Sequence, residues 1–260
     1  MSWSVTRLTL RLRLTSTVSA AVGLVAVMLV VGALFPAVGD TIGKLDIPTS
    51  VANLLGGADY GTITGWFRSE IAVIYAPLVM GALAITGASA TTAGEEEDRI
   101  LALVLAYPIR RSRLVLAKAA AVVILVLVVA LATWVGLLVG VAAGGGGISI
   151  GHITAIALQL AFFGLATGAL ALALGAGTGR RSLATGVAAA VAVLGWLINS
   201  FAPLVSPIAW LKYLTLFYYY AGRDPLTRGV DVRGVVVLGL TSLVLVGLAV
   251  VGFDRRDLRA

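Results

Sequence analysis

The sequence predicts an all-α membrane protein with six transmembrane helices. Of its 260 residues, 60% are hydrophobic and 12% are charged, whereas a soluble domain is about half apolar and about a quarter charged. The mean hydropathy is +1.04. A bilayer core about 30 Å thick needs roughly 20 apolar residues per helix, and six stretches qualify. They are residues 17–38, 71–92, 114–142, 153–177, 183–204 and 235–253, within a single transmembrane domain of residues 1–260.

Residues 1–16 form a basic arm in front of the first span. The apolar residues of the arm alternate, which is the period of a strand. An isolated strand at a membrane surface would leave its backbone groups unpaired, so we expect a cytoplasmic interfacial helix instead. The apolar stretch that follows is longer than the roughly 7–15 residues of a signal-peptide core. We therefore expect it to be a retained span.

Lysine and arginine residues lie mainly in four segments that six spans would place on one side of the membrane. These segments hold thirteen of them, against six on the other side. By the positive-inside rule, both termini and the loop 93–113 are cytoplasmic in a multi-pass protein of the cell membrane. The net charge of +7 thus indicates topology and not a nucleic-acid partner. The basic residues that mark this side are Arg7, Arg11, Arg13, Arg110, Arg111, Arg113, Arg180, Arg181, Arg255 and Arg256.

The predicted spans are nearly free of ionisable groups, which ion-coupled carriers usually place within the membrane. Gln159 and Asn199 are the main polar candidates there. They are either interhelical hydrogen-bond partners, which we favour, or ligands along a transport pathway. The single His152 has no partner for a metal site or a catalytic pair. With no cysteine and no P-loop in the sequence, we predict no catalytic, metal or cofactor site in this chain.

Nine charged side chains lie between residues 91 and 118. We expect Gly94 to end the second span, as a glycine just after a helix does. The acids at 95–98 would then begin a new helix, where they complement the helix dipole. The apolar run up to Pro108 is too short to span, so it would lie at the membrane surface. The alternative is a solvated charge cluster that only fixes topology.

This loop carries a resemblance to a known family. The run EEEDRILALVLAYPIRRSRLVLAK at 95–118 resembles the signature that type-2 ABC transporter permeases carry between spans two and three. A second match comprises LTLFYYY at 214–220, the Asp-Pro-Leu at 224–226, and FDRRDL at 253–258. The family's usual Gly-Thr-Leu after the acids is Arg-Ile-Leu here, at 99–101. The resemblance covers nearly the whole chain.

Similarity to this family implies the membrane-spanning subunit of an ABC exporter, which is not itself an enzyme. Two permease subunits, identical or different, would pair in the bilayer. Each would dock on a separate ATP-binding subunit that holds ATP and Mg²⁺. A coupling helix in the loop 93–113 would grip that subunit. The coupling residues would be Glu95, Glu96, Glu97, Asp98, Arg99, Leu101 and Leu105.

The resemblance further implies an outer re-entrant segment at 205–234. Its aromatic residues would then close an outer gate, although aromatic residues also concentrate at any membrane interface. The candidate gate residues are Phe217, Tyr218, Tyr219 and Tyr220.

Other functions remain open. The chain could be a non-transporting anchor or scaffold that holds a cytoplasmic partner by the same loop. An autonomous channel or secondary carrier is disfavoured by the uncharged spans, and an intramembrane enzyme lacks a nucleophile and base. No motif encodes the cargo, although a nearly uncharged pathway suits an amphipathic or hydrophobic molecule.

Overall fold

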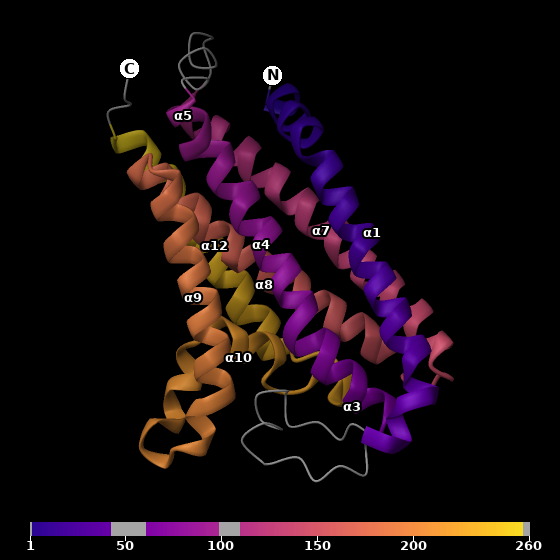
Figure 1. Ribbon diagram of the computed structural model, residues 1–260. Coiled ribbons are helices and arrows are strands. Elements are labelled where there is room, and N and C mark those ends of the chain that lie inside the picture. The colour runs from indigo at the N-terminus through magenta and orange to yellow at the C-terminus, as the bar shows by residue number, and fades with distance from the viewer. Residues whose placement is uncertain (1, 43–60, 99–109, 257–260) are drawn as a thin grey trace.

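The computed structural model describes residues 2–42, 61–98 and 110–256, which form a bundle of long helices (Figure 1). Within these ranges there is no strand. Six helices are long and apolar enough to cross a membrane, which confirms the predicted fold class. The long helices are α1 (Ser2–Ile42), α4 (Ala76–Ser89) with its extensions, α7 (Arg111–Ala143), α8 (Ile150–Thr178), α9 (Arg181–Phe201) and α12 (Val232–Arg255).

The basic arm is helical, as expected, and it continues into the first span as the single helix α1. No break in the helix separates the two parts. α1 packs along α7, and the two backbones come very close where glycines face each other. A Cβ added at Gly32 would lie 2.6 Å from the carbonyl carbon of Gly140, and one added at Gly140 would lie 3.0 Å from that of Met28. Any side chain at these two glycines would push the helices apart.

The helix of the second span is longer than the stretch 71–92. It runs from Ile63 to Glu97 through α3 (Ile63–Phe67), η1 (Arg68–Tyr75), α4, η2 (Ala90–Gly94) and α5 (Glu95–Glu97). The segments η1 and η2 are π-helical, and such segments are rare and frequent at functional sites. They lie at the two ends of α4.

Gly94 does not end this helix, so that expectation is wrong. Its φ of −65° and ψ of −45° are those of a right-handed helix, and the acids follow in the last turn. An added Cβ at Gly94 would lie 3.4 Å from the exposed Arg181 side chain, so the packing does not demand a glycine there. The helix continues because groups on α7, α9 and α12 hold the acids of its last turn.

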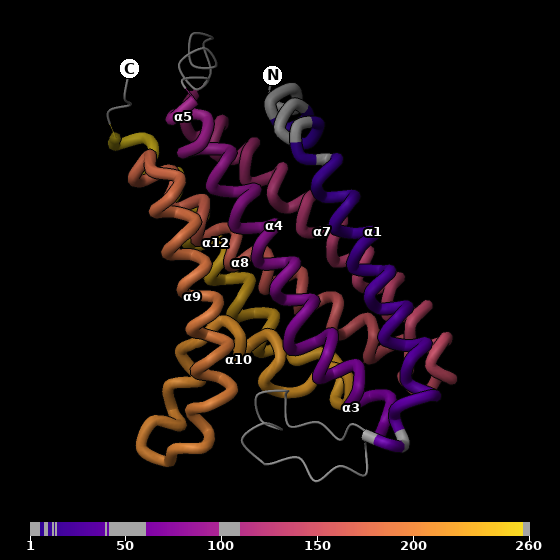
Figure 2. Tube along the Cα trace, viewed as in Figure 1, coloured from indigo at the N-terminus to yellow at the C-terminus, as the bar shows by residue number. Residues whose placement is uncertain are grey.

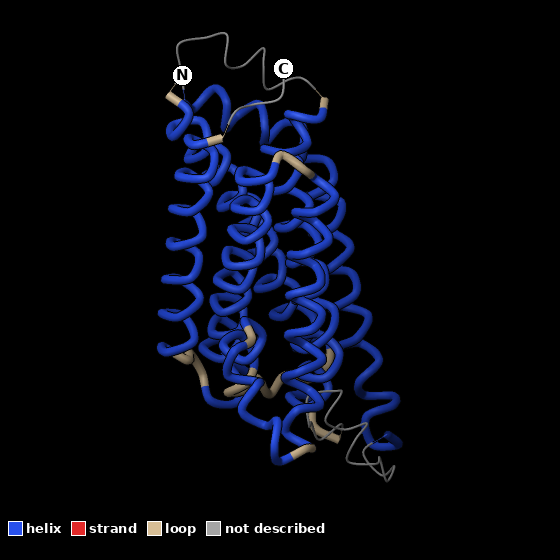
Figure 3. Tube along the Cα trace, turned by 90° about the vertical axis from the view of Figure 1, so that its left-hand side faces the viewer, coloured by secondary structure: helices blue, strands red, loops and turns tan. Residues whose placement is uncertain are grey.

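α8 is the central helix. Of its most apolar stretch 78% is buried, against 22% for α1, α9 and α12. It packs against α4, α7, α9 and α12, and Figure 3 shows the long helices running alongside one another between two ends. The three helices with only 22% of their apolar stretch buried, α1, α9 and α12, therefore expose apolar faces that suit lipid or another membrane chain.

Both termini lie at one end of the bundle, as Figure 2 shows. The starts of α7 and α9 and the end of α12 lie there too. Short helices occupy the opposite end: η3 (Ala202–Leu204), η4 (Ser206–Leu214), α10 (Leu216–Ala221) and α11 (Pro225–Arg228). The shared end of the termini agrees with an even number of spans. Its assignment to the cytoplasm stays a prediction.

The close approach of α1 and α7 gives a stability test. We expect Gly32→Ala to lower the free energy of unfolding in detergent by about 1–3 kcal/mol, because overpacking forces the backbones apart. Gly23→Ala on the same helix is the matched control, since a Cβ there meets nothing within 4 Å. Equal stabilities of the two variants would contradict the packing described.

Candidate functional site

The acidic turn lies at the C-terminal end of the second span's helix and not at the start of a new one. Glu95, Glu96 and Glu97 form its last turn, α5, and Asp98 is the C-cap. This corrects the expectation that the acids begin a helix. Carboxylates at a helix C-terminus face the negative end of the dipole, which is unfavourable. Groups from other helices must stabilise them.

Glu95 pairs with a lysine of α7. Its Oε2 lies 2.5 Å from Nζ of Lys118, whose side chain is only 1% exposed. A buried ammonium group without a counter-charge would be strongly destabilising. The burial of Lys118 therefore depends on Glu95.

Glu96 pairs with Arg256 at the end of α12, and the carboxylate side chain is 4% exposed. Arg256 is held in turn by Arg111, whose Nη1 donates to the Arg256 carbonyl at 2.9 Å. Gly179 allows the pair to form. It adopts the left-handed φ of 64°, and a Cβ there would lie 2.8 Å from Oε2 of Glu96 and would clash with the Arg256 guanidinium.

Glu97 caps helix α9. Its Oε1 accepts a hydrogen bond from the backbone N–H of Arg181 at 2.8 Å. The N-cap residue Arg180 provides no side-chain cap, so the carboxylate comes from another helix. A negative charge at a helix N-terminus complements the dipole and satisfies a free N–H.

We call Glu95, Glu96 and Glu97, with Lys118, Arg181 and Arg256, the acidic hub. It joins the end of the second span's helix to α7, α9 and α12. Arg13 of α1 lies close enough to interact with it: burial and the charge of Arg181 lower the Arg13 pKa, and Glu95 opposes that shift. The hub thus lies where five long helices meet.

The predicted coupling residues are divided by the structure. Three of the acids make hydrogen bonds or ion pairs inside the chain, whereas Asp98 is exposed and its side chain makes neither with any described residue. Arg99, Leu101 and Leu105 lie outside the described residues.

The arginines predicted to mark one side belong to the first part of α1, the starts of α7 and α9 and the end of α12. These helix ends share the end of the bundle that holds the termini (Figure 2). Three of them have a second role that sequence reasoning missed. Arg111 donates to the Arg256 carbonyl, the backbone N–H of Arg181 donates to Glu97, and Arg256 pairs with Glu96. Lys118 was also missed as a partner of Glu95. The arginines at this end are Arg7, Arg11, Arg13, Arg110, Arg111, Arg113, Arg180, Arg181, Arg255 and Arg256.

At the opposite end, two of the predicted gate aromatics form a buried cluster. Phe217 and Tyr220 of α10 pack on Phe163 of α8, with ring centroids 6.1 and 5.2 Å apart. The Tyr220 hydroxyl donates to the Ala72 carbonyl at 2.7 Å. Burial raises the pKa of Tyr220, so the hydroxyl keeps its proton for this bond. The cluster fastens α10 to the second and fourth spans.

The other two aromatics lie nearer the surface. Tyr218 packs edge-on against Tyr213 with centroids 4.8 Å apart, and the Tyr219 hydroxyl donates to the Tyr213 carbonyl at 3.0 Å. Nε2 of Gln159 donates to the Tyr219 carbonyl at 3.3 Å. This fits the interhelical role that we favoured for Gln159.

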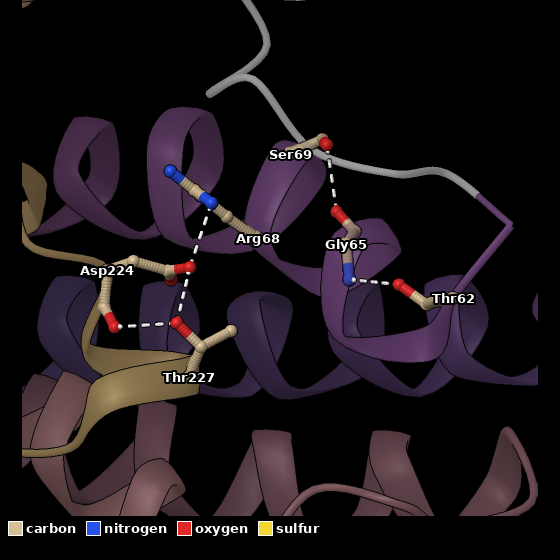
Figure 4. A network of polar contacts seen from close by, with 6 residues as sticks. All are labelled: Thr62, Gly65, Arg68, Ser69, Asp224 and Thr227. Atoms are coloured by element: carbon tan, nitrogen blue, oxygen red, sulfur yellow. Dashed lines mark hydrogen bonds and ion pairs between the residues drawn. The ribbon is translucent and has the colours of Figure 1, made fainter.

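A cavity of about 240 Å³, the polar cavity, lies beside this cluster. Across it, Nη1 of Arg68 lies 2.8 Å from Oδ2 of Asp224, and the Thr227 hydroxyl donates to the same oxygen at 2.7 Å (Figure 4). Asp224 has a left-handed φ of 53°, which aspartate tolerates better than most residues. The polar side chains that line the cavity are Arg68, Asn199, Ser200, Lys212, Tyr218 and Asp224.

A second cavity of about 380 Å³, the apolar groove, runs between α4 and α9. Its wall on the second span's helix extends from Val73 at the end of η1 to Thr86 in α4, and its α9 wall from Thr185 to Trp196. Val73 and Phe217 line both cavities, so the groove and the polar cavity lie next to each other at these two side chains.

No group of three or more His, Asp or Glu side chains is placed to hold a metal ion in the described part of the chain.

The buried Lys118–Glu95 pair gives a second test. We expect Lys118→Met alone to lower the free energy of unfolding by about 3 kcal/mol, because it leaves a poorly solvated carboxylate without its counter-charge. The double variant Lys118→Met with Glu95→Gln should recover part of that loss, as measured by unfolding in mixed micelles. Additive losses in the double variant would show that the two side chains do not interact.

Comparison with known families gives one assignment. The model described as "Multidrug efflux system permease Rv1217c, C-terminal domain" matches residues 4–254, which is nearly the whole chain. The comparison with curated proteins found no match. The matched region contains five of the six apolar helices whole and the sixth up to residue 254, both cavities, and every hub residue except Arg256. This chain belongs to the permease family of the Rv1217c C-terminal domain.

Proposed function

We propose that this chain is the membrane-spanning subunit of an ATP-driven ABC exporter. Its family is one of efflux permeases, and the sequence has no P-loop of its own. The energy would therefore come from a separate ATP-binding subunit that holds ATP and Mg²⁺. The resemblance of the run at 95–118 to the type-2 signature supports this partner.

The acidic hub is the observation that carries the proposal. It stands directly before residues 99–109, where the partner would press on the loop. A displacement of α5 would act on α7 through Glu95, on α12 through Glu96 and on α9 through Glu97. Buried pairs resist separation because an isolated buried charge is costly. The three contacts would thus move the helices together.

A second permease subunit, identical or different, would complete the pathway. α9 buries only 22% of its apolar stretch and forms one wall of the apolar groove, so it presents an apolar face for such a neighbour. Asn199 would supply a polar group at the far end of the path. The aromatic cluster around Phe217 and Tyr220 would act as the gate at that end.

The first test is assembly with an ATP-binding subunit encoded beside this gene. We expect a complex of two permease and two ATP-binding subunits in nanodiscs, with an ATPase rate that changes when this chain is present. A chain that purifies alone and leaves that rate unchanged would favour the anchor or scaffold function instead.

The second test separates transmission through the hub from direct contact with the partner. We expect Glu96→Gln to reduce the effect of this chain on the ATPase rate about tenfold while membrane insertion stays intact, because the link to α12 is weakened. Asp98→Asn is the matched control, since that carboxylate is exposed and makes no contact in the described residues. A larger effect of Asp98→Asn would mean that the acids act by touching the partner.

A further inference from the structure

We propose that the polar cavity and the apolar groove form one binding site for a single-chain anionic amphiphile. Such a ligand has one acidic head group and one apolar tail. The inference deepens the proposed function, because it names a cargo class for the same pathway. The assignment of this ligand as a cargo rests on the proposed function, whereas the binding itself requires only this chain.

The two cavities are adjacent. Val73 and Phe217 line both of them, so a ligand that passes these two side chains would have one end in the polar cavity and the other in the groove. The polar cavity lies at the end of the bundle away from the termini, and the groove runs from it along α4. A ligand that is polar at one end and apolar along its length matches this shape.

The charges of the polar cavity favour an anion. Arg68 and Lys212 supply two positive charges, and Asp224 supplies one negative charge. Asp224 is already engaged by Arg68 and by Thr227. Lys212 lies 5.1 Å from the ring centre of Tyr213 and forms no ion pair with any described residue. One cation therefore remains uncompensated.

Other hydrogen-bond donors in the cavity are also unused. A guanidinium group has five N–H donors. Arg68 uses one of these donors in its hydrogen bond to Asp224. Asn199 and Ser200 line the cavity and make no side-chain hydrogen bond within the described ranges. An acidic head group would accept bonds from these donors without displacing Asp224.

The apolar groove suits one tail. The wall from Val73 to Thr86 is about 20 Å long at about 1.5 Å per helical residue. At Gly81 an added Cβ would meet nothing within 4 Å, so the glycine leaves the groove open at its middle. A volume of about 380 Å³ holds one extended chain, whereas a phospholipid would bring two. We therefore assign the site to a free single-chain amphiphile and not to a membrane lipid.

The test uses the full chain in nanodiscs of zwitterionic lipid, with tritiated palmitate as the probe. Hexadecyltrimethylammonium has the same tail and the opposite charge. We expect palmitate to bind saturably and the ammonium compound to compete at least about tenfold less well. Equal competition by both would overturn the assignment of an anionic head, and so would displacement of palmitate by two-chain phosphatidylglycerol at equal concentration.

Two variants locate the head and the tail. Lys212→Gln should weaken palmitate binding about tenfold and leave binding of uncharged hexadecanol unchanged. Arg233→Gln, an exposed arginine at the same end, is its matched control. Gly81→Leu should abolish binding of both ligands, whereas Gly247→Leu, at another glycine with open space around it, should not. Binding that survives both Lys212→Gln and Gly81→Leu would overturn the site.

The same preparation distinguishes this inference from the proposed function. Charge-selective binding by a chain that never responds to an ATP-binding subunit would keep the site and remove the ATP-driven exporter. An ATP-driven complex whose chain shows no preference for palmitate over the ammonium compound would keep the exporter and remove the site.

Discussion

The burial of charge at a helix C-terminus is the constraint on which one end of this bundle depends. Glu95, Glu96 and Glu97 lie where the helix dipole disfavours them, and their retention there requires positive groups from three other helices. The chain supplies an ammonium, a guanidinium and a helix N-terminus, one for each carboxylate. No single one of these contacts could be removed without leaving a polar group poorly satisfied. The ends of the second, third, fifth and sixth spans are therefore fixed relative to one another by charge, while apolar packing holds them along their length.

Much of the fold could be predicted because hydropathy alone separates spans from connections in a chain this apolar. The helical conformation of the acids at 95–97 could not be predicted, because a glycine before a polar cluster normally signals a helix end. Here the helix continues past Gly94 because partners on α7, α9 and α12 hold the acids, and no local pattern indicates those partners. The pairing of Glu96 with Arg256, 160 residues away, was equally invisible. Arg181 and Arg256 had both been interpreted as topology signals, yet the backbone N–H of Arg181 and the side chain of Arg256 are partners of two of the acids.

The opposite end follows a different logic. There the aromatic run at 217–220 was recognisable from sequence, but which of its residues are buried was not. Phe217 and Tyr220 turn inward to Phe163, and Tyr218 and Tyr219 stay near Tyr213. Helical spacing places residues three apart on one face, which explains the inward pair. The salt bridge between Arg68 and Asp224 joins two regions 156 residues apart in sequence, so only the folded chain shows that a polar cavity lies beside the aromatic cluster.

One helix connects the two ends. The second span's helix begins near Arg68 at the polar cavity, forms a wall of the apolar groove along α4, and finishes in the acids of the hub. A π-helical segment lies on each side of α4, and such segments are frequent at functional sites. In the proposed exporter, a push at the hub would therefore reach the groove wall through continuous helical backbone. A shift of α4 relative to α9 would change the width of the groove, because those two helices are its walls. In that proposed exporter, the same backbone would connect the groove mechanically to the hub, without a chain of side-chain contacts through the core.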